Sequence, residues 1–166
     1  MYKRIIIVYL LAVVGFTSCK KDDFNFLSQN HPDVPVTVSN LYGTFNGVPT
    51  VATSLSGGGA ITITLNIPSG SGRTIKEITK VALGTNTTNY VVVQNSTAAY
   101  NAAPIAGNGT SVTFSTTLTE YTAKTGLTVT ASGTATSFLA RYFYFLITLD
   151  NGQQIIPVPV RVYVNT

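Results

Sequence analysis

The segment AITITLNI, residues Ala60–Ile67, decides the fold class of this chain. Its apolar side chains stand at every second position, with threonine or asparagine between them. Because successive side chains of an extended strand point to opposite faces, this alternation predicts a β-strand with one buried face. Glycine-rich segments bound the strand on both sides, Gly57–Gly59 before it and Ser69–Gly72 after it.

Further strand signals follow at short intervals along the chain. Threonine, valine, isoleucine, tyrosine and phenylalanine dominate it, and these residues suit a pleated, half-buried surface. Asn46-Gly47 is typical of a two-residue hairpin turn. The sequence therefore predicts an all-β chain, with these additional strands: Val34–Val38, Leu41–Asn46, Pro49–Leu55, Ile78–Leu83, Tyr90–Gln94 and Val112–Leu118.

One short helix is expected among the strands. Thr117 and Glu120 stand at capping-box spacing, where a hydroxyl and a carboxylate satisfy two unpaired backbone amides. Gly126 stands where a left-handed residue ends a helix. We expect a helical turn at Leu118–Thr125 that crosses from one sheet to the other.

Two long strands are predicted at the C-terminal end, Phe138–Leu149 and Gln154–Val164. A tight Asn-Gly turn and a four-residue loop, Asp150–Gln153, both place Leu149 opposite Gln154. The prolines favour the loop, because the tight turn would put Pro157 and Pro159 at hydrogen-bonded positions. In this register the core face carries four predicted pairs: Ile147 with Ile156, Phe145 with Val158, Phe143 with Val160 and Leu139 with Val164.

The opposite face of this hairpin is the candidate binding site. It carries Tyr142, Tyr144, Arg161 and Tyr163, and it is too aromatic for an ordinary solvated face. Aromatic rings stack on sugars, and arginine offers a planar set of donors to hydroxyls or carboxylates. Three other interpretations stay open: cover by a hairpin over residues 41–56, docking of another protein, and ordinary cross-strand pairing. The absence of tryptophan weighs against a glycan platform.

The N-terminal residues predict a lipoprotein signal. Lys3 and Arg4 precede an uncharged apolar run, Ile5–Phe16, and then Thr17-Ser18-Cys19. The run is too short for a spanning helix, which needs about 20 residues. We expect cleavage before Cys19 and lipid on its thiol. Residues 20–35 are charged or polar without apolar periodicity, and they predict a flexible tether.

Charge and composition exclude several classes of function. The net charge of +4 includes Lys3 and Arg4, and the bases left after cleavage are scattered, so no basic stripe predicts nucleic-acid binding. The only histidine, His31, lies in the tether, and the acids of the body are Glu77, Glu120 and Asp150. Their spacing indicates no paired carboxylates and no metal ligands. We expect no enzyme activity, no metal and no cofactor.

The predicted strands, the helical turn and the long final hairpin suggest an immunoglobulin-like antiparallel β-sandwich. Phe114–Leu118, Leu127–Val129 and Tyr142–Gly152 resemble the end of such domains in small surface lipoproteins of polysaccharide-utilisation outer-membrane systems, including the starch-utilisation type. The resemblance covers the signal, the tether and roughly the last 55 residues. It implies anchoring at the outer membrane, facing the cell surface or the periplasm.

The sequence thus predicts three parts: a signal peptide at 1–18, the lipidated Cys19 with a tether to residue 35, and a sandwich at 36–166. We expect a membrane-anchored, non-catalytic binding module, accessory to a glycan uptake complex. The alternative is a structural or adhesion subunit that contacts other envelope proteins. The expected partners are the membrane, through the lipid anchor, and either a polysaccharide or an envelope protein.

Overall fold

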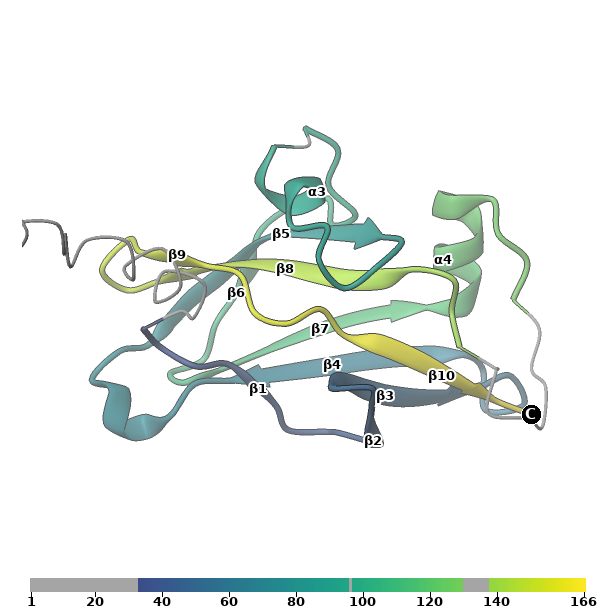
Figure 1. Cartoon of the computed structure of the whole chain (residues 1–166), viewed down its shortest axis with the longest axis horizontal. Helices are drawn as coiled ribbons and strands as arrows, with labels where there is room; N and C mark the ends of the chain where they lie inside the picture. Colours follow the sequence, from purple (N-terminus) through teal and green to yellow (C-terminus); the bar gives the residue numbers. More distant parts are fainter. Residues whose placement is uncertain (1–32, 96, 130–137) are drawn as a thin grey trace, which may run out of the picture. The chain divides into compact units, whose positions relative to one another are not determined.

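The computed structural model describes residues 33–95, 97–129 and 138–166 (Figure 1). Cys19, the predicted signal and most of the tether lie outside these residues. Val34, which lies where the predicted tether overlaps the predicted strand Val34–Val38, is buried in the main core. Within the described ranges, no helix is long and apolar enough to cross a membrane.

The first sheet contains the strand that the alternation at residues 60–67 predicts. β4 (Ala60–Asn66) lies between β1 (Thr37–Val38) and β7 (Ser111–Thr117), and both neighbours run antiparallel to it. The apolar side chains of β4 face the core, and its threonines face outward. The predicted one-sided burial is confirmed.

The second sheet is antiparallel and has the order β6-β5-β8-β9. Its centre is the long pair β5 (Ile75–Gly84) and β8 (Tyr142–Leu149). β6 (Ile105–Ala106) and β9 (Gln154–Ile155) are short edge strands. Phe143, Phe145 and Ile147 of β8 are fully buried in the same core cluster as the inward residues of β4 and β7. The two sheets therefore share one core, and the all-β sandwich with a short helical turn is confirmed.

A third group of strands joins segments that are far apart in the sequence. β2 (Gly43–Phe45) and β3 (Val48–Ser54) form an antiparallel hairpin, whose turn residues Asn46 and Gly47 both have positive φ angles, 52° and 78°. This is the predicted Asn-Gly hairpin turn. β10 (Arg161–Asn165) pairs with β3 in parallel, with Arg161 opposite Thr50 (Figure 1).

The helix after β7 matches its prediction. α4 (Leu118–Thr125) begins after Thr117, whose hydroxyl accepts a hydrogen bond from the amide of Glu120 at 3.1 Å. It ends at Gly126, which has a φ angle of 69°. The carboxylate of Glu120 bonds the Thr116 hydroxyl and Lys124 instead of completing the box.

The predicted strand Tyr90–Gln94 is wrong. These residues form a single turn of helix, α3 (Val91–Gln94). A three-residue 3₁₀ turn, η1 (Ser69–Ser71), lies between β4 and β5. Val93 is fully buried and packs with Ala82 and Tyr144 on the outer face of the β5–β8 pair. Burial of this valine against the sheet outweighs the weak helix propensity of Val91-Val92-Val93.

The predicted register of the final hairpin is also wrong. Ile147 lies opposite Ile155, one residue short of the predicted partner Ile156. The amide of Leu149 donates to the carbonyl of Gln153 at 2.9 Å, so the loop is Asp150–Gly152 instead of a four-residue loop. Gly152 takes the positive φ angle, 84°, that a three-residue hairpin loop requires.

The prolines explain where the last strand breaks. Phe143 does pair with Val160 as predicted. Between the pairs Ile147–Ile155 and Phe143–Val160, the last segment therefore advances by five residues while β8 advances by four. The extra residue falls in the interval that contains Pro157 and Pro159, which have no amide hydrogen to donate. Val158, a predicted core residue, is therefore turned outward and is 49% exposed. Neither its predicted pairing with Phe145 nor that of Leu139 with Val164 forms: Leu139 donates its amide to Val162 instead.

Candidate functional site

Alternation along β10 places Arg161 and Tyr163 on the outer side of the molecule. Val162 and Val164, between and after them, are buried in the core. Because β10 lies beside β3, the hairpin β2–β3 brings its own rings to the same place. We call the resulting surface the aromatic face; its members are Tyr42, Phe45, Phe138, Tyr142, Arg161 and Tyr163.

The rings of the aromatic face touch in series. Tyr42 stacks on Tyr163, with ring centres 5.3 Å apart and planes within 5° of parallel. Phe45 lies beside Tyr42 at 6.3 Å and 17°. Phe138 meets both Tyr163 and Phe45 edge-on, each at 5.3 Å. Tyr42 and Phe45 nevertheless remain 54% and 37% exposed, so both side chains are open to solvent in part.

Arg161 closes one end of the aromatic face. Its guanidinium carbon lies 4.1 Å from the ring centre of Phe138 and 5.2 Å from that of Tyr142. Both contacts are within the range of cation–π attraction. Nε of Arg161 is buried and has no hydrogen-bond partner among the described residues.

The structure therefore divides the four predicted site residues. Tyr142, Arg161 and Tyr163 come together, but Tyr144 is 0% exposed and does not belong to an exposed face. Its hydroxyl donates to the carbonyl of Asn86 at 2.5 Å and accepts from the amide of Asn89 at 3.0 Å. Burial also raises the pKa of this hydroxyl. Tyr144 is on the predicted side of β8, but the segment that contains α3 covers it.

Cover by a hairpin over residues 41–56 is one of the alternative interpretations, and the structure does place this hairpin against the predicted site. The β2–β3 hairpin stacks Tyr42 on Tyr163 and thereby extends the aromatic surface. Sequence reasoning missed Tyr42, Phe45 and Phe138 as site residues. The Asn-Gly turn marks the hairpin, but the strand on which the hairpin docks depends on the parallel pairing with β10, for which the sequence has no local signal.

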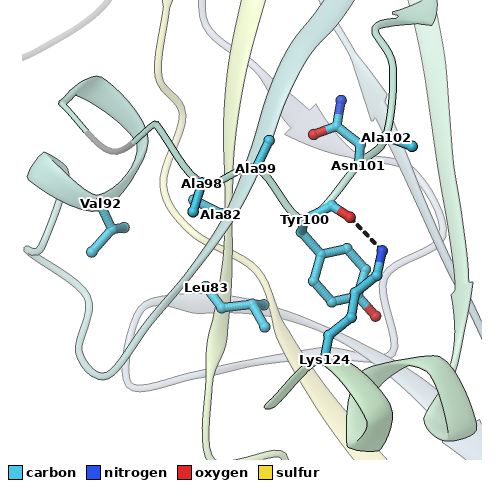
Figure 2. Close-up of a pocket in the computed structure, with 9 residues that line it drawn as sticks. All are labelled: Ala82, Leu83, Val92, Ala98, Ala99, Tyr100, Asn101, Ala102 and Lys124. Atoms are coloured by element: carbon cyan, nitrogen blue, oxygen red, sulfur yellow. Dashed lines mark hydrogen bonds between the residues drawn. The ribbon is translucent and has the colours of Figure 1, made fainter.

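A groove lies beside the outer face of the β5–β8 pair, near α3. Its volume is about 600 Å³, and it lies between α3, the segment 98–102 and α4 (Figure 2). Four of its nine lining residues are alanines, whose short side chains leave the space open; the full set is Ala82, Leu83, Val92, Ala98, Ala99, Tyr100, Asn101, Ala102 and Lys124. Figure 2 shows Lys124 reaching from α4 along the ring of Tyr100.

The polar side chains of this groove are bonded within the protein. Lys124 donates to the carbonyl of Tyr100, pairs with Glu120 at 2.6 Å and lies 4.2 Å from the centre of the Tyr100 ring. The amide of Asn101 bonds the backbone of Val81 and Ala103. The Tyr100 hydroxyl bonds Thr116, and burial raises its pKa. The groove therefore offers shape, but few donors or acceptors that would orient a ligand.

The three acids of the body occupy separate positions. Glu77 accepts from the Thr79 hydroxyl at 3.2 Å. Hydrogen bonds from Lys124 and Thr116 lower the pKa of Glu120. Asp150 lies in the β8–β9 turn, at the opposite end of the sheets from α4 (Figure 1). Among the described residues there is no group of three or more potential metal ligands.

A scan against family models, a search of curated proteins and a search of solved structures each found no match. The function is therefore inferred from the chemistry of the site itself.

Proposed function

We propose that this chain is a membrane-anchored, non-catalytic binding module that holds a glycan on its aromatic face, as an accessory to a nutrient uptake complex. One observation carries the proposal: Tyr42 and Phe45 are partly exposed, their rings lie in near-parallel planes 6.3 Å apart, and Tyr163 stacks on Tyr42. Open rings of this kind offer an apolar surface to the C–H groups of a sugar, and the tyrosine hydroxyl adds a hydrogen-bonding edge.

The rings are supported before any ligand arrives. Tyr163 is fixed on β10, and Phe138 packs edge-on against both Tyr163 and Phe45. A supported ring loses little side-chain freedom on binding, so less of the binding energy is spent on ordering it. The chain has no tryptophan, but several smaller rings in contact can together provide a stacking area as large as that of a tryptophan ring.

The proposed anchor makes weak binding useful. Lipid on Cys19, with two or more acyl chains, would hold the domain at the outer membrane, on the cell surface or the periplasmic side. A tethered module meets a polymer at high effective concentration, so modest affinity at each site suffices.

A second function is favoured by one feature of the same surface. Leu41, next to Tyr42 in the chain, is 45% exposed, and aliphatic side chains beside aromatic ones are typical of protein contacts. This is the structural or adhesion role, with another envelope protein in place of the glycan.

The test is affinity electrophoresis of the full-length chain, purified in a non-ionic detergent, in gels containing a panel of polysaccharides. We expect at least one polymer to retard the wild type. Tyr42→Ala should weaken that binding by about fivefold, equivalent to about 1 kcal/mol for one stacking ring.

Val91→Ala is the matched control. Val91 is also an exposed apolar residue, at 57%, but it lies on α3, on the other side of the molecule from β2 (Figure 1). It should bind as the wild type does. Absence of retardation on every polymer, or equal losses in both variants, would reject the glycan proposal and favour a protein partner.

A further inference from the structure

Two aromatic rings lie against the Arg161 guanidinium. The ring centres of Phe138 and Tyr142 are 4.1 and 5.2 Å from its central carbon, within the range of cation–π attraction. The five N–H donors of a guanidinium lie along its planar edge. The two ring contacts engage the charge of the group and use none of these donors.

No acceptor within the described residues uses that edge. Nε is buried without a partner, and the ion pair found among these residues joins Lys124 to Glu120. The segment just before Phe138, residues 130–137, contains no aspartate or glutamate. Among the described residues Arg161 thus has a buried donor without a partner and no paired acid, a cost that an anionic ligand on its other N–H donors would offset.

We infer that the glycan bound by the aromatic face is acidic, and that the carboxylate of a uronic acid residue binds the edge of the Arg161 guanidinium. This inference rests on the proposed function and specifies its substrate class. A carboxylate matches the arginine edge with two parallel hydrogen bonds, a geometry that a lysine ammonium does not provide.

The spacing of the site requires an oligosaccharide. Arg161 contacts Phe138, Phe138 contacts Tyr163 at 5.3 Å, and Tyr163 contacts Tyr42 at 5.3 Å. The cation and the most exposed ring are thus separated by two intervening rings. One sugar ring stacks on Tyr42 while the carboxylate of another sugar unit in the same chain reaches Arg161.

The experiment compares acidic polymers with their neutral esters. Polygalacturonate and alginate are each set beside the esterified form of the same polymer, so that the sugar rings are retained and only the charge is removed. The full-length chain in non-ionic detergent is run in gels of all four. We expect one acidic polymer to bind about tenfold or more tightly than its ester.

Variants assign this preference to Arg161. Arg161→Gln should lose the preference for the acid, and Arg161→Lys, which keeps the charge but not the paired donors, should lose most of it. Arg73→Gln is the matched control, because it removes the same charge from an exposed residue of the turn before β5 and should leave the preference unchanged. Thermal unfolding of each variant identifies any that fails to fold; if Arg161→Gln does, the Arg161→Lys result decides.

The outcomes separate this inference from the proposed function. If the acid and its ester bind equally well, and Tyr42→Ala weakens both, the inference that the ligand is acidic is wrong and the proposed glycan-binding function is supported. Loss of the preference in Arg73→Gln, or its survival in Arg161→Gln, would overturn the role of Arg161. A fifth gel contains poly-glutamate. Binding of poly-glutamate but of no polysaccharide would overturn both the acidic-glycan inference and the proposed glycan binding, and it would favour an acidic protein as the partner.

Discussion

A Cβ atom built on Gly107 would overlap the carbonyl oxygen of Ile75, and its next nearest neighbour is the carbonyl carbon of the same residue. These are backbone atoms at the start of β5, so they have no rotamer through which to move aside. The amide of Gly107 also donates to the carbonyl of Lys76 at 2.8 Å, which fixes the approach of the two segments. Glycine is therefore required here by space and not by a positive φ angle.

Gly107→Ala should lower the free energy of unfolding by about 1–3 kcal/mol or more, because the two backbones must separate to admit a methyl group. Urea unfolding followed by circular dichroism measures the change. Gly70→Ala is the control, since Gly70 is exposed with no atom near its Cβ position. It should be neutral or slightly stabilising. Equal stability of the two variants would show that β5 tolerates displacement at this point.

Single residues also show how far side-chain alternation predicts burial. The alternation of β8 correctly places Phe143, Phe145 and Ile147 inward and Tyr142 and Tyr144 outward. It does not predict what covers the outward side. Tyr144 is buried because α3 packs over it, and Gly84 leaves room for its ring: a Cβ on Gly84 would lie 2.5 Å from Cε2 of Tyr144. Coverage of this kind depends on tertiary packing and not on the period of one strand.

Among the elements, α4 is the one whose ends follow directly from local chemistry. The Thr117 hydroxyl caps its first turn and Gly126 ends its last turn, and each contacts only residues close to it in the sequence. The sequence therefore predicts the bounds of this helix. α3 and the last strand could not be predicted in the same way. Three consecutive valines indicate a strand when read locally, and the displacement at Pro157 and Pro159 depends on which partner strand the chain follows next.

Thr117→Ala should destabilise the protein by about 1 kcal/mol, because it removes the acceptor of the Glu120 amide at the start of α4. Chemical denaturation of this variant and of a control, Thr119→Ala, measures the effect. Thr119→Ala makes the same chemical change at an exposed position inside the helix and should be neutral or slightly stabilising, since alanine favours helix. Similar losses in both would show that Thr117 acts through β7, which it ends, and not as a cap.

At the scale of the whole molecule, the parallel pairing of β10 with β3 creates the candidate site. It joins residues near 45 to residues near 163, and Phe138 completes the contact from a third segment. The sequence predicts the hairpin and the last strand separately, including Arg161 and Tyr163, but contacts across more than a hundred residues leave no periodic signal. For this reason the all-β class could be predicted from the sequence and the composition of the aromatic face could not.

The proposed anchor and the proposed ligand site occupy separate parts of the chain, so a single substitution should separate their effects. In a bacterial host fed radioactive palmitate, the wild type should be labelled and found with membranes. Cys19→Ala should be unlabelled, because it lacks the thiol that would carry lipid, and it should keep its signal segment. Thr17→Ala, which keeps a small residue before the cut, should be labelled as the wild type is.

The same variant tests whether binding depends on the anchor. The residues of the aromatic face begin at Tyr42, so Cys19→Ala purified in detergent should be retarded in polysaccharide gels as strongly as the wild type. On whole cells its capture of the polymer should fall, because a module that is not held at the surface loses the effective concentration that the tether provides. Palmitate label on the variant would place the anchor elsewhere, and loss of binding in the gels would mean that the two activities are not separable.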